Sequence, residues 1–204
     1  MMASKNLIAW VLCFFISFSS VYVYGQSLPR FRVHADSLRG INENDLQKMK
    51  AAMSLFEEVM NDTSFRNALL AKTFYFDVAG DHNKLLSTKE IVDKIYAARE
   101  FYRDSADGVA NLFWIIEKKN KPIFTRNPAI GYGDAGELEI YTYTWFFWQE
   151  DRENLAAIAG HIAHEWSHKL GFQHLFNPHK KRKFTVPYAF GYLVKEYALK
   201  KLTP

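Results

Sequence analysis

The sequence predicts one domain of the α+β class, in which helices pack against a twisted mixed sheet. Of its 204 residues, 49% are hydrophobic and 24% charged, so the chain can bury one sizeable core. Segments with apolar residues at helical spacing alternate with short runs rich in β-branched and aromatic residues. The composition excludes a disordered or collagen-like protein, and no segment resembles a linker or a repeat.

The first 25 residues are expected to be a secretory signal peptide. Lys5 precedes an apolar run from Leu7 to Phe18, and Val23 and Gly25 fit the pattern before a cleavage point, which we place between Gly25 and Gln26. An uncleaved membrane anchor is the alternative. However, roughly twelve strongly apolar residues are short for a span of about 20, so no stable membrane insertion is expected after cleavage.

Cysteine usage and charge indicate the compartment and exclude one class of partner. The only cysteine, Cys13, lies within the apolar run, so a mature domain of residues 26–204 would have no thiol and no disulfide. This is ordinary for a bacterial periplasm or culture medium and less usual for an animal extracellular domain. We therefore expect a secreted or periplasmic protein and favour a bacterial one. A formal net charge of +4 is too small to indicate a nucleic-acid partner.

The first half of the mature chain alternates extended segments and helices. An extended segment from Phe31 to His34 precedes a helix expected from about Glu43 to Met60, whose apolar residues recur on one face. A short strand is expected from Thr73 to Asp77, and a second helix from Thr88 to Tyr102. After an Asp-Gly turn, the continuous apolar run from Ala110 to Ile116 predicts a buried strand.

The second half contains two further extended segments and two helices. We expect an extended piece around Phe124 to Tyr132 and a strand around Leu138 to Tyr143, where apolar and aromatic residues alternate. A helix of about 20 residues follows, because acidic residues suit its start and Gly171 suits the left-handed position after its end. A last helix is expected from Ala189 to Lys201.

The helix that ends at Gly171 has two different faces. The apolar stripe that should face the core consists of Leu155, Ile158, Ala159, Ile162, Trp166 and Leu170. His164 and His168 fall on the opposite side, four residues apart, where their imidazoles can converge on one ion. Glu165 flanks this pair, where a general base would take a proton from a metal-bound water.

A third histidine makes this pattern more specific. A helix that stops at Gly171 lets the chain turn back and bring His174 to the same ion. Three neutral imidazoles and an open position form a catalytic zinc arrangement, whereas structural zinc usually has a fourth protein ligand, often cysteine. The mature domain has no cysteine to offer.

Residues His164 to His174 match the pattern H-E-x-x-H-x-x-G-x-x-H, and over these eleven residues the chain resembles the metzincin clan of zinc metalloendopeptidases. The resemblance implies a metzincin-like zincin domain, with an upper subdomain of about residues 26–171 and a lower one of about 172–204. It implies that His164, His168 and His174 bind Zn2+ and that Glu165 is the general base and acid. It also implies a substrate-binding edge strand near Arg126 to Tyr132.

One part of the metzincin pattern is missing, because no methionine follows the motif. The best candidate for the turn that normally holds it is Thr185 to Tyr188, with Val186 as an apolar plug. By resemblance, Tyr188 has the offset of a tyrosine that in some metzincins reaches the zinc or the developing oxyanion, which gives it a catalytic role. The alternative is a core tyrosine before the last helix.

Two other features near the motif receive a structural interpretation. His161 shares the histidine face and could be a ligand in a shifted set, but we favour a residue that lines the site or contacts the ligands. The basic run from His179 to Lys183 is expected to be a solvated loop, although beside the site it could favour acidic substrates.

The sequence therefore predicts a monomeric, secreted zinc endopeptidase that acts on a protein or peptide substrate. Zinc would polarise the scissile carbonyl and activate a bound water, and Glu165 would move the proton. Two other classes stay open. One is a zinc-binding interaction protein without turnover, and the other is a zinc hydrolase of a cell-wall amide, since the zinc chemistry does not depend on what flanks the carbonyl.

Overall fold

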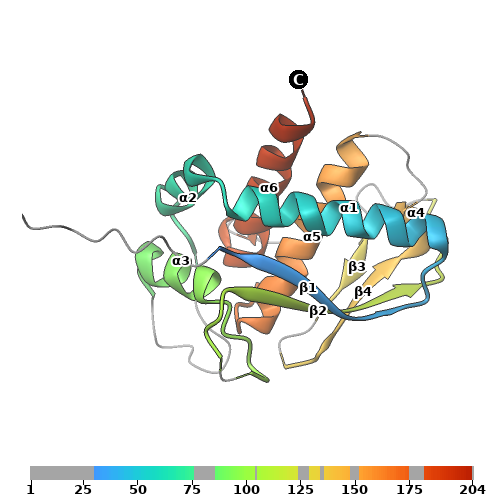
Figure 1. Ribbon diagram of the computed structural model, residues 1–204, viewed down its shortest axis with the longest axis horizontal. Coiled ribbons are helices and arrows are strands. Elements are labelled where there is room, and N and C mark those ends of the chain that lie inside the picture. Colours follow the sequence, from blue (N-terminus) through green and yellow to red (C-terminus); the bar gives the residue numbers. More distant parts are fainter. Residues whose placement is uncertain are drawn as a thin grey trace, which may run out of the picture.

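A computed structural model describes residues 30–75, 86–103, 105–123, 129–133, 136–147, 152–174 and 182–203. Within these residues the chain forms one four-stranded mixed sheet and six α-helices, which confirms the α+β class (Figure 1). In chain order the elements are β1 Arg32–Arg39, α1 Glu43–Met60, α2 Thr63–Leu70, α3 Thr88–Ala97, β2 Val109–Glu117, β3 Gly131–Tyr132, β4 Glu139–Tyr143, α4 Thr144–Phe147, α5 Arg152–Lys169, the 3-10 helix η1 Arg182–Phe184 and α6 Val186–Leu202. The predicted signal peptide lies outside the described residues.

The sheet has the strand order β1-β2-β4-β3, so β3 is an edge strand among the described residues. Strands β1, β2 and β4 are parallel, and β3 pairs antiparallel with β4 through Gly131 opposite Thr142 and Tyr132 opposite Tyr141. The extended piece expected around Phe124 to Tyr132 is therefore confirmed at its end, while residues 124–128 lie outside the described part. Figure 1 shows β3 beside β4, away from β1.

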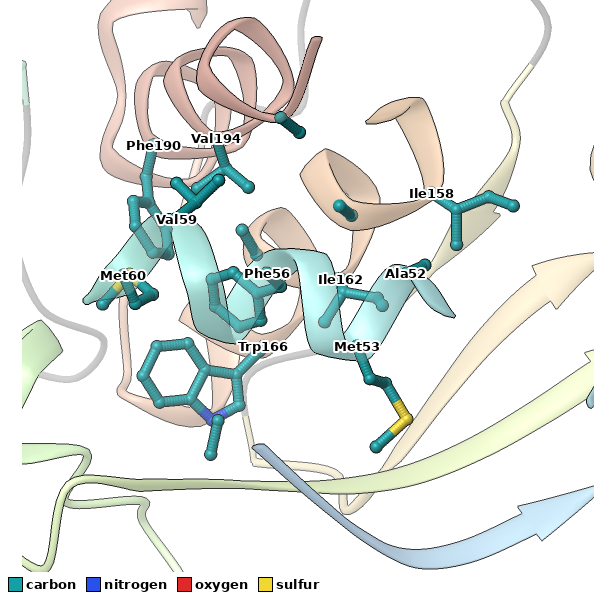
Figure 2. Close-up of a cluster of buried hydrophobic side chains, with 14 of the residues drawn as sticks. Ala52, Met53, Phe56, Val59, Met60, Ile158, Ile162, Trp166, Phe190 and Val194 are labelled. Carbon is teal, nitrogen blue, oxygen red and sulfur yellow. The ribbon is translucent and has the colours of Figure 1, made fainter. Parts of the chain in front are cut away.

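The core lies where α1, α5 and α6 meet beside the sheet. Figure 2 shows Phe56 of α1, Trp166 of α5 and Phe190 of α6 pointing toward one another. The Phe56 ring centroid lies 6.0 Å from that of Trp166 and 6.1 Å from that of Phe190. Each of these buried side chains stabilises the fold by about 1.5–3 kcal/mol or more. The last helix thus shares its core with α1 and α5, and the division into two subdomains stays a prediction.

Helix α1 begins and ends at the predicted residues, because its local signals are strong. Asn42 caps the N-terminus by accepting a hydrogen bond from the Asp45 backbone N–H at 2.9 Å. Met49, Phe56 and Met60 lie on one face and are fully buried.

In the following segment one predicted strand is absent and one helix was missed. The residues from Thr73 to Tyr75 form no strand in the described part of the chain, and the Tyr75 N–H donates instead to the Phe184 carbonyl at 2.9 Å. Residues 76 and 77 of that predicted strand lie outside it. Helix α2 was not expected, although Asp62 caps it by accepting from the Ser64 and Phe65 N–H groups.

Helix α3 ends at Ala97 rather than Tyr102, because Ala98 adopts the left-handed conformation with φ 51°. Three residues after the end of α3, Glu100 is buried in the core. Its buried carboxylate accepts hydrogen bonds from the Asn111 backbone N–H at 2.7 Å, the Asn111 side chain at 2.9 Å and Trp166 Nε1 at 2.6 Å. These donors compensate the cost of burying the charge and tie α5 to β2.

Helix α5 is also fixed at its middle and its end. A Cβ on Gly160 would lie 2.7 Å from the Gly191 carbonyl oxygen, and a Cβ on Gly191 would lie 2.7 Å from that of Gly160. The two glycines therefore let α5 and α6 cross in direct backbone contact. At the end of α5, the buried Lys169 ammonium donates to the carbonyls of Glu137 and Glu139, just before and at the start of β4.

Candidate metal centre

The structure brings His164, His168 and His174 together. One ring nitrogen from each lies within 4.8 Å of the others. His164 and His168 lie on α5, and the chain then turns at Gly171, whose φ of 85° ends the helix and lets His174 return to the cluster. Three imidazole nitrogens this close together can bind one metal ion.

The two faces of α5 differ as predicted, but the sequence did not predict that another element covers the histidine face. The apolar stripe faces the core as predicted, with Ile158, Ile162 and Trp166 buried. The histidine face, however, is covered by α6, and a Cβ on Gly191 would lie 3.0 Å from His164 Cβ. The predicted metal ligands therefore stand in a largely buried environment.

His168 is oriented for metal binding by a backbone carbonyl. Its Nδ1 lies 2.7 Å from the Phe172 carbonyl oxygen, and the side chain is buried. Since a carbonyl only accepts, Nδ1 carries the proton, and the lone pair of Nε2 is left to bind a metal. Metal-ligating histidines are commonly held by such a bond on their second ring nitrogen.

Burial favours the neutral form of the His164 and His168 imidazoles, which is the form that binds a metal. Burial lowers the pKa of His168 to about 4. The hydrogen bond to the Phe172 carbonyl raises this pKa but does not offset the effect of burial. Burial also holds the pKa of His164 well below its usual value, and nearby histidines and Arg182 push it in the same direction.

Glu165 lies beside the cluster, as the sequence predicted. It is 5% exposed. Its Oε1 lies 3.9 Å from His164 Nε2, and its Oε2 lies 4.0 Å from His168 Nε2. The end of the edge strand approaches the same carboxylate, because a Cβ on Gly133 would lie 3.0 Å from Oε2. The carboxylate therefore flanks the ligands and leaves the three-nitrogen cluster intact.

Tyr188 also lies at the cluster. Its ring centroid is 4.5 Å from that of His164 and 5.1 Å from that of His174. Burial raises the pKa of Tyr188, although Arg182 opposes the shift, so the phenol keeps its proton at neutral pH and can donate a hydrogen bond.

The turn expected at Thr185 to Tyr188 is instead the beginning of α6. Thr185 is the N-cap residue, and Pro187 occupies the first helical turn, where its missing N–H costs nothing. Val186 is buried, as expected of an apolar plug.

Arg182 is a residue of this region that the sequence did not single out individually. Its guanidinium carbon lies 4.9 Å from the Tyr188 ring centroid, and the side chain is partly buried. For Arg182 the expected solvated loop is therefore wrong, whereas residues 175–181 lie outside the described part. No local sequence signal predicts this contact, because it joins η1 to the start of α6.

His161 does not belong to the three-histidine cluster. It contacts Glu165, with Nδ1 3.4 Å from Oε1, on the side of the carboxylate that faces the sheet. This agrees with a residue that supports the site and gives no support to a shifted ligand set.

No protein-family model, curated protein or solved structure matches this chain. None of the helices in the described residues is long and apolar enough to span a membrane. The donor set itself narrows the choice of metal, because three imidazoles suit zinc and other borderline transition metals better than magnesium or calcium.

Proposed function

We propose that the chain is an exported zinc-dependent endopeptidase with a metzincin-like catalytic domain. The observation that supports this most strongly is the convergence of His164, His168 and His174 with the Glu165 carboxylate about 4 Å from two of their nitrogens. A structural zinc site would not need a buried carboxylate outside the ligand set. A catalytic site needs such a group to move a proton.

The residues present fit a zinc ion. His164, His168 and His174 would hold it, because they are largely buried, close together and, for His168, already oriented by the Phe172 carbonyl. When bound, zinc polarises the scissile carbonyl and increases the acidity of water at the open position.

Glu165 and Tyr188 perform the remaining steps of peptide hydrolysis. Glu165 takes a proton from water as the water oxygen bonds to the carbonyl carbon. It then passes this proton to the amine nitrogen as the C–N bond breaks, which leaves a carboxylic acid and an amine. Tyr188 donates a hydrogen bond to the carbonyl oxygen as it gains negative charge, and Arg182 packs against the Tyr188 ring.

The edge strand β3 supports an extended peptide as the substrate. A peptide can add to an exposed strand edge through backbone hydrogen bonds. Tyr132 of β3 is partly exposed, and Gly133, the next residue, lies against Glu165. A peptide that pairs with β3 would therefore run past the proposed general base.

The test is digestion of an unbiased peptide mixture by the purified, zinc-loaded protein, with new termini identified by mass spectrometry. Wild-type protein should cleave, and a chelator should abolish cleavage. Glu165→Ala should keep one zinc per chain and lose at least about 10²- to 10⁴-fold in kcat, because it removes the general base. His168→Ala should lose both zinc and cleavage.

Glu153→Ala is the matched control, because Glu153 is an exposed glutamate at the other end of α5. It should cleave like the wild type. Full activity in Glu165→Ala would contradict the proposal. A folded, zinc-loaded wild-type protein that cleaves no peptide would also contradict it, and would favour an interaction protein or a hydrolase of cell-wall amides, for which peptidoglycan fragments are the next substrate.

A further inference from the structure

A buried histidine outside the ligand cluster makes polar contacts on both sides of its ring. His161 is 5% exposed. Its Nε2 lies 2.8 Å from Thr142 Oγ1 on β4, and its Nδ1 lies 3.4 Å from Glu165 Oε1, one helical turn further along α5. His161 therefore connects the sheet to the carboxylate beside the metal centre.

The His161 ring is held in one place by its surroundings. The rings of Trp114 and Phe146 meet it edge to face, at centroid distances of 5.6 and 6.0 Å. Above it lies the backbone of the edge strand, because a Cβ on Gly131 would be only 2.7 Å from His161 Nε2. A ring confined by three elements can position a neighbouring carboxylate.

The partners of the ring limit the choice of tautomer to two. Burial lowers the pKa of His161 to about 3, so the imidazole is neutral at pH 7 and has one N–H. The Thr142 hydroxyl can donate to Nε2, whereas the Glu165 oxygen 3.4 Å from Nδ1 can accept a hydrogen bond from a proton on Nδ1. The Tyr141 backbone carbonyl is also a hydrogen-bond partner of the ring, and because a carbonyl can only accept, it would favour the opposite tautomer. The two tautomers make different predictions.

We propose that His161 is a positioning residue, which donates its Nδ1–H to Oε1 of Glu165 and keeps Oε2 directed toward the side of His168. Thr142 supports this tautomer by donating its hydroxyl hydrogen to Nε2. The role of His161 in catalysis rests on the proposed function. The contact and the tautomer do not, and they can be measured without a substrate.

The first readout is therefore NMR of the folded, zinc-loaded protein with 15N-labelled histidine. The proposal requires the His161 signals of a neutral ring protonated at Nδ1. A ring protonated at Nε2 would overturn it, because Glu165 would then face a lone pair. This result is independent of whether the protein cleaves peptides, so a correct tautomer in an inactive protein would refute only the proposed function.

The second readout is the separation of kcat from KM. His161→Leu should lower kcat by about 10- to 100-fold, with KM and zinc content unchanged, because groups that orient a catalytic centre have effects of this size. His161→Asn should recover part of kcat, because its amide nitrogen can stand near the position of Nδ1. His161→Gln places its amide near the position of Nε2 and should recover less.

Two substitutions of Thr142 form a matched pair of variants in which His161 itself is unchanged. Thr142→Val removes the hydroxyl with little change in volume and should lower kcat several-fold, whereas Thr142→Ser keeps the hydroxyl and should retain most of kcat. If His161→Leu fails to fold, this pair and the NMR measurement decide the question. Unchanged kcat in His161→Leu, equal kcat in the two Thr142 variants, or loss of zinc from a folded His161→Leu protein would each overturn the proposal.

Discussion

Helix α5 buries two faces in different ways. On one face Ile158, Ile162 and Trp166 pack against apolar and aromatic side chains, as Figure 2 shows. On the other face His161 and His168 are equally buried but make specific polar contacts, with Thr142 and with the Phe172 carbonyl. Burial alone therefore does not distinguish a structural face from a functional one. The distinction lies in the energetics of burial. Burial of apolar atoms stabilises the fold by itself, whereas burial of polar atoms is unfavourable unless they form hydrogen bonds or bind a metal.

The two faces should respond differently to substitution. Removal of a side chain from the apolar face should destabilise the fold, whatever the metal content. Removal of a side chain from the polar face should affect metal binding and turnover more than the stability of the metal-free protein. Four experiments test this contrast.

The largest effect is expected on the apolar face. Trp166→Ala should lower the free energy of unfolding by about 3–5 kcal/mol, because it leaves a cavity. It also removes the Nε1–H donor to the buried Glu100 carboxylate. Urea denaturation with a chelator present measures this change. Under the same conditions His168→Ala should cost clearly less, and an equal loss would contradict the contrast between the faces.

The next effect concerns turnover at the polar face. Tyr188→Phe should lower kcat by about 10²-fold, with zinc content unchanged, because it removes a hydrogen-bond donor to the developing oxyanion. Steady-state kinetics on a peptide identified by the digestion gives the value. Tyr192→Phe is the matched control, since Tyr192 is an exposed tyrosine one turn further along α6. If the two variants behave alike, the phenol of Tyr188 has no part in the reaction.

A smaller effect should distinguish the two glycines at the crossing of α5 and α6. Gly160→Ala and Gly191→Ala each place a methyl group against the carbonyl of the other helix, and each should cost about 1–3 kcal/mol of stability. Only the Gly191 methyl would also press on His164 Cβ. Zinc titration of the folded fractions should therefore show weaker binding in Gly191→Ala. Equal zinc affinities would mean that α6 does not hold His164 in place.

The smallest effect is a dependence of stability on pH. Burial lowers the pKa of His161 to about 3 and that of His168 to about 4, below the 6.5 expected in an unfolded chain. Between these values the unfolded chain binds more protons, so the free energy of unfolding of the metal-free protein should fall as the pH falls from about 7 to about 4. Denaturation curves at several pH values in this range measure the slope.

Substitutions on the two faces should change this slope differently. His161→Leu removes one buried imidazole and should make the slope shallower, while Ile162→Val on the apolar face should leave it unchanged. A slope that is the same in all three proteins would show that the polar face does not contribute to acid sensitivity.

Local patterns in the sequence determined much of the fold and most of the candidate site. The helical spacing of apolar residues predicted α1 to the residue and the apolar stripe of α5, and alternation predicted β4. The motif from His164 to His174 predicted three converging histidines, because a four-residue spacing and a helix-ending glycine determine where side chains point.

Only the tertiary structure decided what lies against those elements. The partners of Glu100, the contact of Arg182 with Tyr188, and the contacts of His161 with Glu165 and Thr142 all join different elements or depend on packing. The spacing of apolar and polar residues along an element indicates which of its faces is apolar, but it does not indicate which other element covers that face. That choice depends on contacts summed over the whole chain, and here it placed α6 against the histidine face of α5, which became the buried wall of a candidate metal centre.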